Sequence, residues 1–180
     1  MYPLNPPLLE PVTVAEAKLA ARLGDSTAFD ALLPGLIAAA RQQAEQETGR
    51  QLMTQTWRTE LASWPAVTDV IPVYQATAAA ASYWTGSVWA TLSGGAYAFA
   101  AVGNGTALAP ALGTSWPSLG DKAVGARVRI DLTAGVASAN DVPECAKLYI
   151  KACVAHAIDN PSQPNPPRSL ASLLDSIRLY

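Results

Sequence analysis

Charge is the property that this sequence has least of. Only 14% of its 180 residues are Asp, Glu, Lys or Arg, against roughly 25% in typical soluble domains. A soluble monomer needs surface charge to stay apart from other copies, so the shortage indicates surface that other chains cover. The net charge of −2 gives no long-range attraction to nucleic acid or anionic lipid. These values argue against nucleic-acid binding through a basic patch.

Residues that bind metals or act as nucleophiles are also scarce. The sequence has one histidine, His156, and two cysteines, Cys145 and Cys153. The cysteines lie eight residues apart on an expected helix, a rise of about 12 Å, whereas a disulfide needs Cα atoms within roughly 7 Å. Cys145 and His156 lie farther apart still, so one ion cannot bind both. We expect two reduced thiols, no metal site and no cofactor.

Catalytic motifs are missing as well. There is no G-x-S-x-G nucleophile elbow, and the glycine runs at 94–95 and 103–106 lack the lysine and following helix of a phosphate loop. A hydrolase that uses His156 stays open as an alternative, although a lone histidine in an apolar helix is usually structural. We expect no catalytic residue and no enzymatic activity.

Long apolar runs are absent, although half of the residues are hydrophobic. No run approaches the roughly 20 residues that a membrane span needs, so we expect no membrane partner. Residues 1–12 contain several prolines and no basic residue, a composition that does not fit a signal peptide. We expect them to form an extended N-terminal arm, on a protein made in a reducing compartment.

The pattern of apolar residues and turn signals predicts an α+β fold. Apolar residues spaced by three and four predict helices over 14–23, 27–49 and 143–159. Thr13 and Glu16 match a capping box at the start of the first helix. The two N-terminal helices and the helix near 143–159 form a small helical core.

Several residues should set the ends of these helices. Pro34 removes a helical donor, so it kinks the second helix or marks its true start. Ser26 or Thr27 is the expected cap of that helix, and Asp141 is the expected cap of the third, which begins at Pro143.

Between these helices, residues 52–137 predict an inserted antiparallel β region. The strand candidates are 53–62, 70–75, 79–84, 88–92, 97–102, 106–109 and 127–133. Asn104-Gly105 is the strongest hairpin turn, because both residues tolerate positive φ. No charged residue lies between Asp69 and Asp121, although this segment is rich in Trp and Tyr.

This charge-free segment has three interpretations. It is the neutral surface of a β-sandwich, a stacking platform for carbohydrate, or a surface that neighbouring copies cover in an oligomer. The aromatic residues at issue include Tyr83, Trp84, Trp89, Tyr97 and Phe99. A carbohydrate-binding β module therefore stays open as a second function.

Residues 160–180 predict a proline-rich linker and a short C-terminal helix capped by Ser169. A helix of about ten residues is not stable alone in water, so it must dock. It either packs back onto its own domain or inserts into a groove of another subunit. Its apolar stripe consists of Leu170, Leu173, Leu174 and Ile177.

Taken in order, these segments resemble the head–tail connector (adaptor) family of tailed bacteriophages. The junction Thr-Gly-Arg-Gln-Leu-Met-Thr-Gln-Thr-Trp at 48–57 is the most specific part of the resemblance. The other matching segments are 11–18, 36–41, 116–117, 128–135, 142–144 and 173–178. Pro34 and the charge-free segment at 70–120 depart from the family pattern.

The resemblance implies a structural protein of the virion neck, assembled in the host cytoplasm. Such connectors form a ring, usually of twelve subunits, under the portal protein. The ring extends the DNA channel and gives tail-completion proteins a platform, and DNA passes through it without specific contacts. The implied connector domain covers 13–159, with its helical core at 13–50 and 143–159 and its β insertion at 52–137.

The resemblance also gives hypotheses for individual residues. The C-terminal helix would dock on the portal through Arg168, Leu170, Leu173, Leu174, Ile177, Arg178 and Tyr180. Contacts between subunits would use Tyr83, Trp84, Trp89, Tyr97, Phe99, Arg41 and Arg50.

Overall fold

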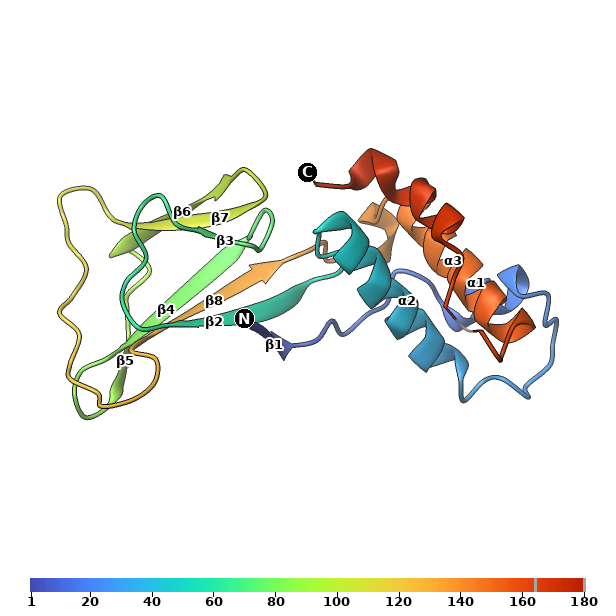
Figure 1. Ribbon diagram of the computed structural model, residues 1–180, viewed down its shortest axis with the longest axis horizontal. Coiled ribbons are helices and arrows are strands. Elements are labelled where there is room, and N and C mark those ends of the chain that lie inside the picture. Colours follow the sequence, from blue (N-terminus) through green and yellow to red (C-terminus); the bar gives the residue numbers. More distant parts are fainter. Residues whose placement is uncertain (164, 180) are drawn as a thin grey trace. The chain divides into compact units, whose positions relative to one another are not determined.

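A computed structural model describes residues 1–163 and 165–179 of the chain. Its contacts divide the chain into two compact units, each with a core of its own. We call them the β unit, which consists of Met1–Pro6 and Thr54–Gly135, and the helical unit, which consists of Pro7–Met53 and the chain from Val136 onward. Helices and antiparallel sheets occur together, so the expected α+β class is confirmed (Figure 1).

The helical unit contains three α-helices and two 3₁₀ helices among the residues described. They are α1 (Val14–Ala20), α2 (Leu33–Thr48), η1 (Ala139–Asp141), α3 (Glu144–Asp159) and η2 (Arg168–Ile177). Their apolar faces meet in one core, in which Leu33 and Ile37 of α2 and Tyr149 and Ile150 of α3 are almost fully buried. These apolar faces therefore pack as their spacing predicts, whereas Leu19 of α1 and Leu148 of α3 are exposed.

The start of α1 confirms the capping box. The N–H and hydroxyl of Thr13 donate to the Glu16 carboxylate at 2.8 and 2.7 Å, and the Glu16 N–H donates to Thr13 Oγ1 at 3.2 Å. These hydrogen bonds from Thr13 lower the pKa of Glu16. The cap therefore stabilises the fold at neutral pH, and its contribution fades as the pH falls through the acidic range. The helix ends at Ala20, earlier than expected, because Arg22 adopts a left-handed φ of 57°.

The expected caps of α2 and α3 are wrong. Residues 27–32 form turns, so neither Ser26 nor Thr27 caps α2, which starts at Leu33 with Pro34 in its first turn. Asp141 closes η1 and does not cap α3, whose preceding residue is Pro143. Proline accounts for the late start of α2, because its missing N–H matters least in the first turn of a helix.

The end of α2 agrees with the sequence. Gly49 takes the left-handed conformation with φ 72°, and its N–H donates to the Glu45 carbonyl at 2.9 Å. A side chain other than glycine would be strained there.

The β unit holds two antiparallel sheets. Its strands are β1 (Tyr2–Asn5), β2 (Gln55–Leu61), β3 (Val70–Ile71), β4 (Ala78–Trp84), β5 (Trp89–Thr91), β6 (Tyr97–Val102), β7 (Gly105–Pro110) and β8 (Val128–Ala134). One sheet has the order β1-β2-β8-β4-β5, and the other has the order β3-β7-β6. Every second residue of β8 is buried, and these residues share a core with Leu108 of β7. The inserted antiparallel β region is thus confirmed.

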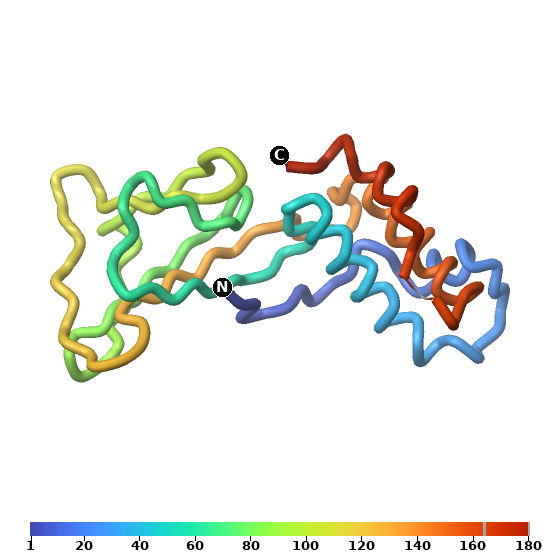
Figure 2. Tube along the Cα trace, viewed as in Figure 1, coloured from blue at the N-terminus to red at the C-terminus, as the bar shows by residue number. Residues whose placement is uncertain are grey.

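Three details of this unit differ from expectation. Tyr2–Asn5, expected to be part of an extended arm, pairs with β2, and the dark blue end of the trace runs beside that strand (Figure 2). The strand at Val70 has only two residues because Pro72 cannot donate to a ladder. The β6–β7 hairpin turns at Gly103-Asn104, since Val102 pairs with Gly105.

Gly105 is needed at its place for a reason other than the turn. A Cβ atom there would lie 2.2 Å from the Ile71 carbonyl oxygen.

No helix in the described part of the chain is long and apolar enough to cross a membrane.

Candidate interaction surfaces

His156 lies in the last turn of α3. Its ring nitrogens lie 3.3 Å from Asn160 Nδ2 and 3.1 Å from the Gln163 carbonyl oxygen. The two cysteines are free, as expected. Burial raises the pKa of Cys153 to about 11, so its thiol stays protonated at neutral pH and is a poor nucleophile. Within residues 1–163 and 165–179, no three His, Cys, Asp or Glu side chains gather as metal ligands.

The C-terminal segment packs against its own chain. Leu174 is completely buried in the helical core, and Leu170, Leu173 and Ile177 pack around it. The segment forms a 3₁₀ helix rather than an α-helix, and Pro167, not Ser169, precedes it. A 3₁₀ helix has three residues per turn, so leucines three residues apart fall on one side.

Polar contacts hold the same segment. Arg50 Nε donates to the Ile177 carbonyl oxygen at 2.6 Å, and the Leu179 N–H donates to the Thr48 carbonyl oxygen at 2.9 Å. Arg178 pairs with Glu47 at 3.2 Å. Arg168 is exposed, and Tyr180, the last of the proposed docking residues, lies outside the described residues. The four apolar docking candidates are therefore engaged within the monomer.

Arg41 is a core residue of the helical unit. Only 3% of its surface is exposed. Its Nε donates to Glu10 at 2.8 Å, and its Nη1 donates to Glu45 at 2.7 Å. This network ties the segment before α1 to α2. The guanidinium proposed for a contact between subunits is thus used inside the chain.

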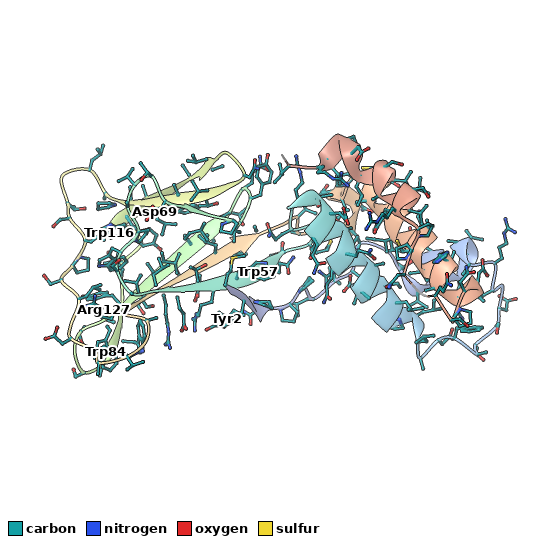
Figure 3. All side chains as sticks on the ribbon, in the orientation of Figure 1. Tyr2, Trp57, Asp69, Trp84, Trp116 and Arg127 are labelled. Carbon is teal, nitrogen blue, oxygen red and sulfur yellow. The ribbon has the colours of Figure 1, made fainter. Side chains whose placement is uncertain are left out.

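Aromatic residues of the β unit also make contacts within the chain. Trp64 stacks on Trp116, with ring centroids 4.5 Å apart, and its indole N–H donates to the Pro117 carbonyl oxygen. The Arg129 guanidinium lies 3.9 Å from the Trp89 ring centroid, and the Trp84 indole N–H donates to the Asp121 carbonyl oxygen. Figure 3 places Trp84 and Trp116 among the side chains of this unit. These contacts give no support to a carbohydrate platform.

The free edge of β6 is an uncharged surface of the β unit. Tyr97 is buried and donates to the Ala79 carbonyl oxygen at 2.6 Å, but the other five residues of the strand, including Phe99 and Val102, are exposed. The strand bonds to β7 on one side only. It lacks the charges and prolines with which proteins usually protect sheet edges. This edge is a template for another strand.

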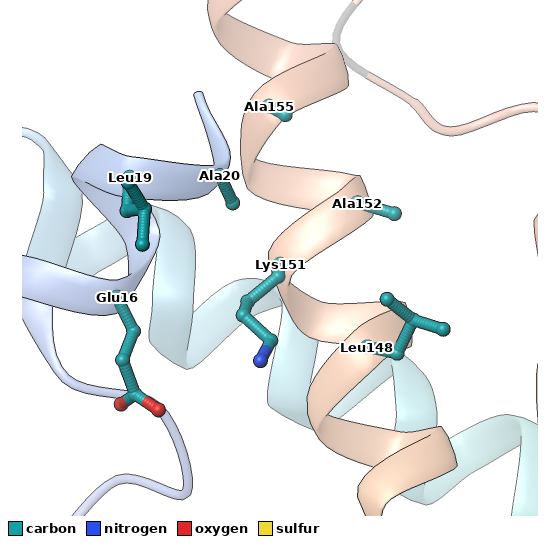
Figure 4. A pocket seen from close by; sticks show the side chains of 7 residues that line it. All are labelled: Glu16, Leu19, Ala20, Leu148, Lys151, Ala152 and Ala155. Atoms are coloured by element: carbon teal, nitrogen blue, oxygen red, sulfur yellow. The ribbon is translucent and has the colours of Figure 1, made fainter. Parts of the chain in front are cut away.

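A second open surface is a groove between α1 and α3, with a volume of about 540 Å³. Leu19 and Ala20 of α1 line it together with Leu148, Ala152 and Ala155 of α3 (Figure 4). Leu19 and Leu148 expose 81% and 52% of their surfaces. The charged lining residues are Glu16 and Lys151.

Sequence reasoning found the first of these surfaces and missed the second. The charge-free segment identified the β6 region. The exposure of Leu19 was missed, because the apolar spacing at 14–23 predicts a helix without showing which of its apolar residues stay open. No periodicity distinguishes a core leucine from one that lines an open groove.

Comparison with solved structures finds chains with a similar fold. A chain in the structure described as the neck of an empty GTA particle, computed with C6 symmetry, is 21% identical and superposes with a TM-score of 0.78, over 100% of this chain and 96% of that one. The chain has the fold of a protein found in gene transfer agent necks.

Two further structures agree. A chain of the virion of the native gene transfer agent (GTA) particle has a TM-score of 0.72 and 22% identity, over 98% of this chain and 96% of that one. A chain from the neck of the native GTA particle, computed with C12 symmetry, has a TM-score of 0.64 and 20% identity over the same shares. No family model and no curated protein matches the sequence. At these identities the likeness concerns the fold of the chain.

Proposed function

We propose that this chain is a non-enzymatic structural connector in the neck of a phage-like virion, where copies of it form a ring. The observation that carries the proposal is the match in fold over the whole chain to chains of GTA necks with C6 and C12 symmetry. A ring of twelve copies is compatible with both symmetries. The low charge of the sequence supports the burial of much of its surface between copies.

The finer parts of the proposal follow the connector resemblance. The ring sits under the portal protein, continues the DNA channel and receives the downstream neck or tail-completion protein. DNA passes through its lumen without specific contacts, in keeping with a net charge of −2. The chain assembles in the host cytoplasm.

Contacts between copies in the β unit remain a prediction. Phe99 on the β6 edge is exposed, while Tyr83, Trp84 and Trp89 are half-buried and can lose further surface. Arg50 is half-buried in the helical unit. Tyr97 and Arg41 act instead as internal supports, because both are buried as well as hydrogen-bonded within the chain.

Native mass spectrometry tests the proposed ring. The purified chain is measured alone and after mixing with portal rings, at concentrations from nanomolar to tens of micromolar. We expect a closed ring of twelve copies, either free or only on the portal. A monodisperse monomer that never joins a portal ring would contradict the connector function.

Docking on the portal is best tested at Arg168. A chain that ends at Asn160 would also lose Leu174 from the core, so its failure would confuse stability with docking. Arg168 is exposed, and we expect Arg168→Glu to weaken portal binding at least threefold without changing the unfolding midpoint. The matched control is Arg22→Glu, an exposed arginine beyond α1. Equal portal affinities of both variants and the original chain, measured by surface plasmon resonance, would argue against docking through this segment.

A further inference from the structure

Two leucines project from the segment that leads into α1. Leu8 and Leu9 expose 98% and 60% of their surfaces. No charged residue precedes them in the chain. These two neighbouring leucines form an exposed apolar projection on the helical unit.

The segment that carries these leucines is held at its base. Glu10 accepts a hydrogen bond from Arg41 at 2.8 Å, Pro11 is buried, and Val12 lies in the core with 1% exposure. Pro7 and Pro11 restrict the backbone on both sides. A projection that is already ordered loses little conformational entropy when it binds. Leu8 and Leu9 are thus presented as a preformed knob.

The groove between α1 and α3 is a recess of matching character. Its alanines leave space, and Leu19 and Leu148 supply apolar walls (Figure 4). Its apolar lining suits aliphatic side chains, which gain about 25 cal/mol for each Å² removed from water. The knob is fastened to α2 through Arg41, whereas the groove lies between α1 and α3. Neither Leu8 nor Leu9 is among the residues that line the groove, so knob and groove are separate surfaces of one unit.

We propose that Leu8 and Leu9 of one copy insert into the α1–α3 groove of the next copy. When a patch and its complementary pocket lie at different places on one molecule, the contact is head-to-tail and repeats, and it closes into a ring when the rotation permits. Cyclic symmetry of this kind is that of the GTA neck structures that share the fold. The inference rests on the proposed ring and names one of its interfaces.

The first test removes the knob. Because both leucines are exposed, the double variant Leu8→Asp/Leu9→Asp should fold with an unchanged unfolding midpoint. We expect it to raise the concentration at which half of the chain is in rings, or the portal concentration needed for ring formation, at least tenfold in native mass spectrometry. Val124→Asp is the matched control, since Val124 is 84% exposed and lies outside the charge-free segment. It should assemble as the original chain does.

The second test asks whether the two surfaces meet. Leu8→Cys and Leu148→Cys are combined with Cys145→Ser, which removes the half-buried natural thiol. On oxidation of the assembled protein, we expect a ladder of disulfide-linked multimers from the double variant and none from either single cysteine variant. Val124→Cys with Leu148→Cys controls for random collision.

The outcomes separate this inference from the proposed function. Rings that form normally with the aspartate variant, and that give no ladder, would overturn the knob-and-groove contact and leave the connector function standing. A chain that forms no ring, alone or on portal, would overturn both. A groove protected from chemical labelling only after a different neck protein is added would assign it to that protein and overturn the contact between copies.

Discussion

Replacing Arg41 with alanine is expected to lower the free energy of unfolding of the helical unit by about 3 to 5 kcal/mol. The guanidinium is nearly inaccessible and binds two carboxylates. Its removal leaves Glu45, whose side chain is 11% exposed, without its cationic partner. An uncompensated charge in such a place is costly, because the folded chain offers it little water.

Urea unfolding followed by circular dichroism at 222 nm measures this effect, at concentrations where the chain is monomeric. Arg168→Ala is the control, because Arg168 is exposed and surface substitutions usually change stability by less than about 0.5 kcal/mol. A loss below about 1 kcal/mol for Arg41→Ala would mean that the network with Glu10 and Glu45 contributes little to the fold. If the stability is unchanged and ring formation is lost, Arg41 acts between subunits, as the sequence first led us to expect.

Leu174→Ala should cost about 3 kcal/mol, within the usual range for a buried leucine. Leu174 is completely buried and comes from the C-terminal segment. The substitution therefore tests whether that segment belongs to the core of the monomer. Removing its side chain leaves a cavity that the surrounding α2 and α3 side chains fill only in part.

Leu19→Ala is the matched control for Leu174→Ala. Leu19 belongs to the same unit but is 81% exposed, so we expect a change within about 0.5 kcal/mol. Both are measured by the same urea titration. Equal small effects of the two substitutions would show that the C-terminal segment is detached in solution, free to reach a groove on another subunit.

The helical unit was predictable where local chemistry determines the backbone. Thr13 and Glu16 cap α1, and Gly49 ends α2, because each effect depends on neighbouring residues alone. The sequence also named Pro34 as a break or a start, and the structure selects the start. The wrong caps, Thr27 and Asp141, are residues of good capping type whose positions are set by packing elsewhere.

In the β unit, local sequence patterns predicted strands but not every pairing between them. The span of β6 was predicted correctly as Tyr97–Val102 from its own residues. The pairing of Tyr2–Asn5 with β2 was not predicted, since it joins residues more than 50 positions apart and β1 contains Pro3. Pairings of this kind depend on the tertiary fold and leave no local pattern.

The candidate surfaces were predictable to different degrees. The missing charge between Asp69 and Asp121 is visible in the sequence and indicated the surface that β6 exposes. The groove could not be predicted, because the sequence does not show which side of α1 faces α3. Leu170 and its neighbours were correctly identified as an apolar stripe, and within the monomer this stripe packs against the helical core.

The bare edge of β6 has a consequence for the timing of synthesis. Until a partner covers that edge, each new copy carries a strand that can pair with any other exposed strand. The risk of aggregation rises with the number of unassembled copies. It falls when copies assemble as fast as ribosomes release them. Production of this chain well ahead of the particle that uses it should therefore fill the cell with insoluble material, whereas matched production should keep it in solution.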